Sequence, residues 1–118
     1  MSAPGKSPVT THVLDTARGR PAAGVPVSLE AGAGADAWKE LGRGATNADG
    51  RAADLLPGGT LQPGRYRLTF DTAAYFKAEG LQGFYPYVQV VFEIRQAGEH
   101  YHVPLLLSPF GYSTYRGS

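Results

Sequence analysis

Apolar and polar side chains alternate with a period of two along several short stretches of this chain. In the stretch 87–95, one side carries the apolar residues Val88, Val90, Phe92 and Ile94. Two further stretches alternate in the same way, one through Tyr66, Leu68 and Phe70 and one through Val25, Val27 and Leu29. Because successive side chains of a strand point to opposite faces, the pattern predicts three half-buried strands with identified inward faces.

The stretch 101–107 predicts a strand that is covered on both faces. One face carries Tyr101, Val103, Leu105 and Leu107, and the other carries His102, Pro104 and Leu106. The loop 96–99 precedes this strand and contains Gly98. We expect the loop to turn the chain back on the strand 87–95, so that the two strands form a hairpin.

Turn-forming residues interrupt the chain at short intervals. Sixteen glycines and nine prolines occur in 118 residues, a density that suits short strands better than long helices. The exception is the stretch 72–79, which predicts a helix capped by Asp71 or Thr72 and ended by Gly80. About seven or eight short strands predict an all-β fold, either a two-sheet sandwich or a barrel.

The length of the chain predicts one domain with its own core. We expect residues 9–118 to form this domain and residues 1–8 to be a disordered extension.

Composition narrows the classes of function. The absence of cysteine excludes disulfides, Cys-ligated zinc, iron–sulfur clusters and thiol catalysis. Eleven basic residues against ten acidic residues give a net charge of +1, without the basic surplus of nucleic-acid-binding proteins. Apolar runs are too short to span a bilayer, and the first eight residues lack the apolar run of a secretory signal. We therefore expect a cytoplasmic protein with neither nucleic acid nor membrane as a partner.

Two histidines occupy polar positions in predicted strands and are candidates for acid–base chemistry. His12 is out of phase with Val13, and His102 is out of phase with Val103. Strands hold side chains stiffly, so both imidazoles can face one pocket, where each can take and return a proton near neutral pH. The alternative is that both are solvated or hydrogen-bonded surface residues. A third ligand at the spacing of a known kind of metal site is missing, so no metal site is predicted. We expect His100 to be exposed to solvent.

The segment TNADGR at 46–51 predicts a tight turn. Asn and Asp side chains can bond the backbone of such a turn, and Gly50 tolerates a positive φ. Arg51 directly follows this turn. Either it presents its planar guanidinium to an anionic or enolate oxygen, or it is an ordinary surface residue. The glycines match neither a phosphate loop nor a dinucleotide fingerprint, so no nucleotide cofactor is predicted.

The C-terminal segment keeps strand-forming and aromatic residues almost to its last position. From Leu105 to Tyr115 it lacks the polar character of a frayed end. Either another subunit covers these side chains and holds residues 115–118 inside the contact, or the segment is an internal strand of the same sheet.

Four parts of the chain read THVLDTARGRPAAGVPVSLE, TNADGR, PGRYRLTFDTAAYF with GFYPYVQVVFEI, and HYHVPLLLSPFGYSTYRGS. Together they resemble the 5-hydroxyisourate hydrolases of the transthyretin-like family, and the similarity extends from Thr11 to Ser118. The final YRGS, residues 115–118, is the most specific part, because it separates the hydrolases from the hormone-carrying transthyretins that share their fold.

The resemblance implies a transthyretin-like sandwich of two four-stranded antiparallel sheets with one short helix. It also implies a homotetramer with active sites at the dimer–dimer interface, and it implies neither a cofactor nor a metal. The essential groups of the family fall on four residues, His12, Arg51, His102 and Ser118. Two more residues, Tyr115 and Arg116, are implied to help form the substrate pocket.

The reaction so implied belongs to purine breakdown: the hydrolysis of 5-hydroxyisourate to 2-oxo-4-hydroxy-4-carboxy-5-ureidoimidazoline. One imidazole draws a proton from water, and the other hydrogen-bonds the substrate or protonates the leaving nitrogen. Which of His12 and His102 does which stays open. Arg51 stabilises the developing negative charge, and Ser118 orients water or substrate. The alternatives are a carrier of a small aromatic ligand in the central channel and a domain that displays loops to a protein partner.

Overall fold

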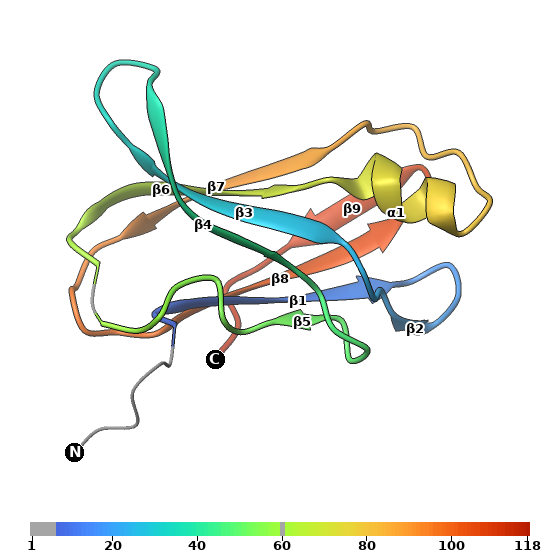
Figure 1. The fold of residues 1–118 in the computed structure, drawn as a ribbon, viewed down its shortest axis with the longest axis horizontal. Coiled ribbons are helices and arrows are strands. Elements are labelled where there is room, and N and C mark those ends of the chain that lie inside the picture. The colour runs from blue at the N-terminus through green and yellow to red at the C-terminus, as the bar shows by residue number, and fades with distance from the viewer. Residues whose placement is uncertain (1–6, 60) are drawn as a thin grey trace.

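Two β-sheets lie face to face, with one short helix at one end of the sandwich (Figure 1). The computed structural model describes residues 7–59 and 61–118. The first sheet contains β1 (Val9–Asp15), β2 (Arg20–Pro21), β5 (Arg51–Ala52), β8 (Tyr101–Ser108) and β9 (Gly111–Thr114). The second contains β3 (Pro26–Gly32), β4 (Trp38–Ala45), β6 (Gly64–Phe70) and β7 (Val88–Ile94). The helix is α1 (Thr72–Ala78), and the architecture confirms the predicted all-β sandwich.

The first sheet differs in two details from the implied pair of four-stranded antiparallel sheets. Its order is β2-β1-β8-β9, and β5 pairs with β1 as a fifth strand. In addition, β1 and β8 run parallel, from the pair Val9 and Tyr101 to the pair Asp15 and Leu107. Side chains alternate in the same way in parallel and antiparallel strands, so the hydrophobic pattern does not reveal strand direction. The second sheet, β4-β3-β6-β7, is antiparallel throughout.

The hairpin predicted around the loop 96–99 is wrong. β7 pairs with β6 in the second sheet, whereas β8 pairs with β1 and β9 in the first. The loop therefore carries the chain from one sheet to the other. The Tyr101 hydroxyl accepts hydrogen bonds from the backbone N–H groups of Arg95 (3.2 Å) and Gln96 (3.3 Å). These bonds satisfy backbone donors where the chain leaves β7, so the crossing needs no strand partner.

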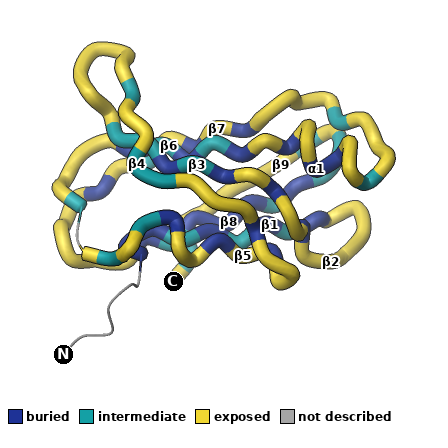
Figure 2. The backbone as a smooth tube through the Cα atoms, in the orientation of Figure 1, coloured by how far each residue is buried: buried dark blue, intermediate teal, exposed yellow. Residues whose placement is uncertain are grey.

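The apolar faces predicted from alternation form the core between the sheets (Figure 2). The buried members are Val25, Val27, Leu29, Tyr66, Leu68, Phe70, Val88, Val90, Ile94, Tyr101, Val103, Leu105 and Leu107. Phe92 is half-buried and packs against this cluster. Burial on this scale is the main force that holds the two sheets together.

The helix α1 begins and ends as the sequence predicts. Asp71 caps its start, because Oδ1 accepts a hydrogen bond of 3.0 Å from the backbone N–H of Ala74. Gly80 follows its end with a φ of +74°, which suits glycine. The hydroxyl of the buried Tyr75 donates a 2.6 Å hydrogen bond to Oδ2 of the buried Asp15, and this bond ties the helix to the end of β1.

Residues 7 and 8 contact the strands β1 and β8. Residues 1–6 of the expected disordered extension lie outside the described residues. Ser7 is buried and its hydroxyl donates to the carbonyl of Val9 at 2.6 Å, while the carbonyl of Pro8 accepts from the N–H of Tyr101. In the described part of the chain, no helix has the length and apolar character needed to cross a membrane.

Candidate functional site

The pairing of β1 with β8 places both candidate histidines on the outer face of the first sheet. Along β1, buried residues that face the core alternate with the half-buried Thr10, His12 and Leu14. His102 is half-buried at the start of β8, and its backbone lies directly beside that of Thr10. The predicted phase of the two imidazoles is therefore confirmed: both lie on the face turned away from the core.

The turn before β5 brings Arg51 to the same face. The Oδ1 atom of Asn47 accepts hydrogen bonds from the backbone N–H groups of Asp49 (2.9 Å) and Arg51 (3.1 Å). Gly50 has a φ of +75°, and a Cβ atom there would lie 2.4 Å from the Val13 carbonyl oxygen. Only glycine fits this turn, as the sequence predicts.

Arg51 lies opposite His12 in the antiparallel pair of β5 and β1. Residues opposite one another in such a pair have Cβ atoms about 4.5–5.5 Å apart. The side chains of these two residues therefore emerge side by side on one surface.

The C-terminal tail returns to the same place. After β9, an edge strand of the first sheet, the chain continues beside β8, and the Gly117 N–H donates to the His102 carbonyl at 2.8 Å. The chain ends beside β1 and β5 (Figure 1). Ser118 thereby joins a cavity of about 220 Å³, which is lined by Thr10, Thr11, Arg51, Ala53, His100, His102 and Ser118.

The surroundings of His102 favour its neutral form. Its Nδ1 lies 2.8 Å from the Thr10 hydroxyl, so Nε2 is the nitrogen left for a ligand. Burial lowers the pKa of the His102 imidazole, and the charges of Arg51, His100 and His12 lower it further. A neutral imidazole with one engaged nitrogen can act as a proton acceptor near neutral pH.

The structure unites three of the six residues singled out by the sequence in one cavity: Arg51, His102 and Ser118. His12 adjoins it, opposite Arg51. Two further cavity residues, Thr10 and His100, were missed as functional residues. The signal that could have found them is their spacing, since each precedes a candidate histidine by two positions and thus shares its face in an extended chain.

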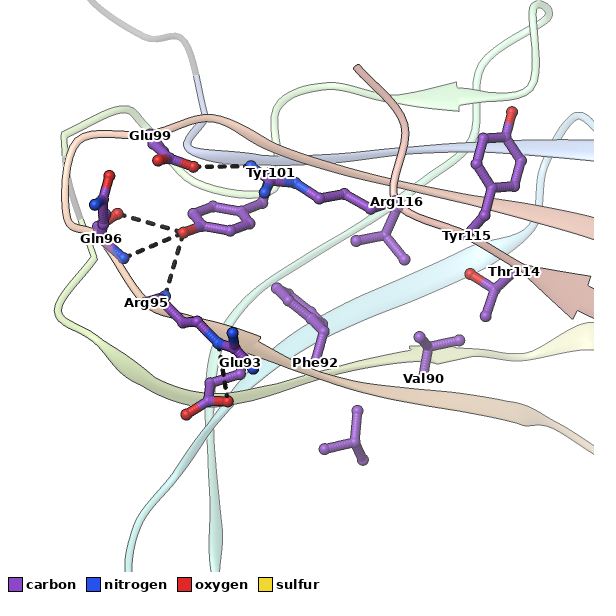
Figure 3. Close-up of a pocket in the computed structure, with 12 residues that line it drawn as sticks. Val90, Phe92, Glu93, Arg95, Gln96, Glu99, Tyr101, Thr114, Tyr115 and Arg116 are labelled. Atoms are coloured by element: carbon purple, nitrogen blue, oxygen red, sulfur yellow. Dashed lines mark hydrogen bonds and ion pairs between the residues drawn. The ribbon is translucent and has the colours of Figure 1, made fainter.

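Tyr115 and Arg116 do not reach this cavity. The Arg116 guanidinium lies over the Tyr101 ring, 4.4 Å from its centre, and Nη2 pairs with Oε1 of Glu99 at 2.9 Å (Figure 3). Tyr115 is exposed. Both line a different cavity of about 610 Å³ between β7 and β9. For Arg116 the reason is that successive residues of an extended chain point to opposite sides, so a tail that presents Gly117 to His102 directs Arg116 away from it.

The chemistry offered by the cavity is polar and cationic. It combines the imidazoles of His100 and His102, the Arg51 guanidinium and the Ser118 hydroxyl, which together can bind a polar, electron-rich molecule and move protons. Among residues 7–59 and 61–118, no group of three or more His, Asp or Glu side chains is placed to hold a metal ion.

Two solved structures resemble this fold closely. A 5-hydroxyisourate hydrolase of Klebsiella pneumoniae has a TM-score of 0.81 and 41% identity, covering 93% of this chain and 98% of that one. A sea bream transthyretin in complex with thyroxine has a TM-score of 0.84 and 32% identity, covering 94% of this chain and 95% of that one.

Sequence comparison points in the same direction. A 5-hydroxyisourate hydrolase of Mus musculus is 52% identical over 113 residues, which are 95% of this chain and 96% of the relative. A 5-hydroxyisourate hydrolase of Salmonella typhi is 47% identical over 116 residues, which are 98% of this chain and 85% of the relative. Residues 9–117 match the model of the HIUase/Transthyretin family. The chain therefore belongs to the HIUase/Transthyretin family.

Proposed function

We propose that this chain hydrolyses 5-hydroxyisourate. The observation that carries the proposal is the convergence of Arg51, His102 and Ser118 on one small cavity, from three separate segments of the chain. Relatives from Mus musculus and Salmonella typhi that carry the name of this hydrolase match nearly the whole chain.

The fold alone does not separate a hydrolase from a carrier. The TM-scores to the Klebsiella pneumoniae hydrolase and to the sea bream transthyretin are 0.81 and 0.84, so the same backbone accommodates both proteins. Function must therefore be argued from the site. A carrier of an aromatic ligand needs an apolar surface, whereas the outer face of β1, β5 and β8 carries imidazoles and a guanidinium.

His102 is the base of the proposed reaction. Its neutral imidazole takes a proton from water through Nε2 while the water oxygen bonds to a ring carbonyl carbon of the substrate. Arg51 donates to the carbonyl oxygen as negative charge develops there. The ring C–N bond then breaks, and the leaving nitrogen receives the proton, which opens the six-membered ring and leaves a carboxylic acid that ionises by releasing its proton to water.

His12 and Ser118 orient the reactants in this scheme. His12, opposite Arg51, hydrogen-bonds the substrate or delivers the proton to the leaving nitrogen. Ser118 orients water or substrate through its hydroxyl or its terminal carboxylate. Arg116 contributes through its pair with Glu99, which fixes the tail and with it the position of Ser118. The scheme uses only water and groups of the protein.

The proposed assembly is a homotetramer with sites between paired dimers. Arg51 and Ser118 are exposed in the single chain, yet charge stabilisation is strongest where water is excluded. A second copy laid over the outer face of the first sheet would cover both groups. Sedimentation would test this assembly, and the cytoplasmic location expected from the sequence stays a prediction that cell fractionation would test.

The test of the function follows the ultraviolet absorbance of freshly generated 5-hydroxyisourate with and without the protein. We expect the protein to accelerate ring opening above the spontaneous rate. A positioned general base contributes about a hundredfold or more, so His102→Ala should lose most of the acceleration. Arg51→Glu should do the same, because it removes the donor that stabilises the developing negative charge. Wild-type protein that leaves the spontaneous rate unchanged would refute the proposal.

The second candidate function is a carrier of a small aromatic ligand, favoured by the thyroxine-bound sea bream structure. Equilibrium dialysis with thyroxine separates the two functions. A carrier would bind thyroxine and leave 5-hydroxyisourate untouched, and a hydrolase would do the reverse.

A further inference from the structure

One hydroxyl lies between two imidazoles at the edge of the candidate site. The Oγ1 atom of Thr10 is 2.8 Å from Nδ1 of His102 and 2.9 Å from Nε2 of His100. Both distances are those of hydrogen bonds. The three side chains therefore form a continuous row, His100–Thr10–His102, which starts at the surface and ends at the candidate base.

The backbone explains why this row forms. Thr10 and His102 are paired residues of the parallel strands β1 and β8, so their side chains emerge side by side on the outer face. His100 precedes His102 by two positions and lies on the same side of the chain. Thr10, Ala53 and His100 also line both the cavity of about 220 Å³ and a neighbouring cavity of about 450 Å³, so the row lies between the two.

The number of protons that Thr10 can donate limits which nitrogens of the two imidazoles are protonated. A threonine hydroxyl has one proton to donate and can accept protons from other donors. It therefore donates to one imidazole nitrogen at most, and any other nitrogen bonded to it must carry a proton. When Nε2 of His100 accepts from Thr10, Nδ1 of His102 must donate, and Nε2 of His102 is then unprotonated.

We propose that Thr10 and His100 are positioning residues that hold His102 as the Nδ1–H tautomer, with the lone pair of Nε2 turned toward the cavity. This inference rests on the proposed function, in which His102 is the base. It adds a reason why that imidazole presents a proton acceptor rather than an N–H donor to water. The hydrogen bond at one ring nitrogen sets the protonation of the other.

The charged groups around His102 do not determine which of its two ring nitrogens carries the proton. The charged or titratable side chains that face the imidazole are Arg51 on β5, His12 on β1 and His100 before β8. Arg51 and the protonated forms of the two histidines disfavour an added charge on His102, but they do not select between its neutral tautomers. The Thr10 hydroxyl selects between them when its one proton is donated to Nε2 of His100, because Nδ1 of His102 must then donate to the hydroxyl oxygen.

Steady-state kinetics test the proposal with matched variants. Thr10→Val keeps the shape of the residue and removes the hydroxyl, whereas Thr10→Ser keeps the hydroxyl. Loss of a partner that orients a functional histidine typically costs about tenfold to a hundredfold in activity. We expect kcat of Thr10→Val to fall by this factor, with KM within about twofold of wild type. Thr10→Ser should recover most of the lost kcat, and His100→Phe should lose an intermediate amount of kcat. Thr16→Val is the control, since Thr16 bonds the Leu107 carbonyl at the far end of the same pair of strands.

Imidazole ¹⁵N NMR tests the tautomer without reference to activity. Wild-type His102 should show a protonated Nδ1 and an unprotonated Nε2, and Thr10→Val should shift the population toward the Nε2–H form. An Nε2–H tautomer in the wild type, or wild-type kcat in Thr10→Val, would overturn the proposal. Failure of the proposed function gives a different result: wild-type protein without ring-opening activity but with the same NMR signature of the row.

Discussion

Gly117 lies so close to the His102 imidazole that no side chain fits between them. A Cβ atom at residue 117 would lie 2.6 Å from Cδ2 of His102 and 3.3 Å from Cγ of Pro104. The next residue is Ser118, which lines the same cavity as His102. The glycine of the tail therefore permits a contact on which the geometry of the site depends.

Gly117→Ala should damage the site while leaving the fold intact. The added methyl group must displace either the His102 ring or the tail, and misplacement of a catalytic group by about 1 Å can cost about a hundredfold. We expect a large fall in kcat with little change in the melting temperature, measured by ring-opening kinetics and thermal unfolding. Gly98→Ala is a control for the substitution itself, because a Cβ atom there meets nothing within 4 Å, although its φ of +92° disfavours alanine. Wild-type activity in Gly117→Ala would contradict the close contact.

The pH dependence of activity should follow the lowered pKa of His102. Burial first, and then the charges of Arg51, His100 and His12, favour the neutral form. The acidic limb of kcat/KM should therefore lie below the ordinary histidine value of about 6.5. Because removal of a positive charge makes protonation easier, Arg51→Gln should raise the pKa of His102. An NMR titration of the His102 ring measures both effects.

The lowered pKa of His102 also determines whether its contribution to the stability of the fold rises or falls with pH. Unfolded chains bind a proton at His102 at higher pH than folded chains do, so between the folded pKa and about 6.5 the unfolded state holds more protons. The contribution of His102 to stability is thus complete above about 6.5 and is lost as the pH falls through its folded pKa. A His102 pKa above its ordinary value would contradict both expectations.

Tyr75→Phe should destabilise the fold without affecting the site. The Tyr75 hydroxyl donates to the carboxylate of Asp15, which is buried. A buried acceptor left without its donor costs about 1–3 kcal/mol. Chemical denaturation should show this loss with unchanged kcat. Tyr87→Phe, at an exposed tyrosine, is the matched control and should leave the free energy of unfolding close to wild type.

Arg116→Gln should weaken activity only modestly, because the guanidinium binds Glu99 rather than the cavity of His102. Exposed ion pairs contribute about 0.2–1 kcal/mol, which corresponds to a loss of about fivefold at most. Glu99→Gln should give a similar loss, and the double variant should lose no more than either single variant. If Arg116 instead contacts the substrate, Arg116→Gln alone would reduce kcat/KM strongly and Glu99→Gln would not.

Local sequence patterns predicted the structural features that depend only on residues close together in the chain. Alternation identified the inward faces, the Asn47–Gly50 turn was read from its turn chemistry, and the phase of His12 and His102 placed both imidazoles on the outer face. Each of these features depends on backbone geometry within a few residues.

The same patterns do not predict which strands pair with one another when they are far apart in the sequence. Apolar alternation is the same whether β8 joins β7 or β1, so the hairpin around residues 96–99 was predicted wrongly. The neighbours Thr10 and His102 are 92 positions apart, and only the register of β1 with β8 brings them together. The direction of Arg116 depends likewise on a tail that continues beside β8 and pairs Gly117 with His102.

The most direct measurement compares ring opening by two variants, one at each of the two cavities lined by residues of the tail. His102→Ala removes the proposed base, and Arg95→Ala removes an exposed cation from the larger cavity between β7 and β9. At equal protein concentration, His102→Ala should lose about a hundredfold or more of the rate, and Arg95→Ala should stay near wild type. Wild-type rates in His102→Ala, or a comparable loss in Arg95→Ala, would place the reaction elsewhere than on the outer face of the first sheet.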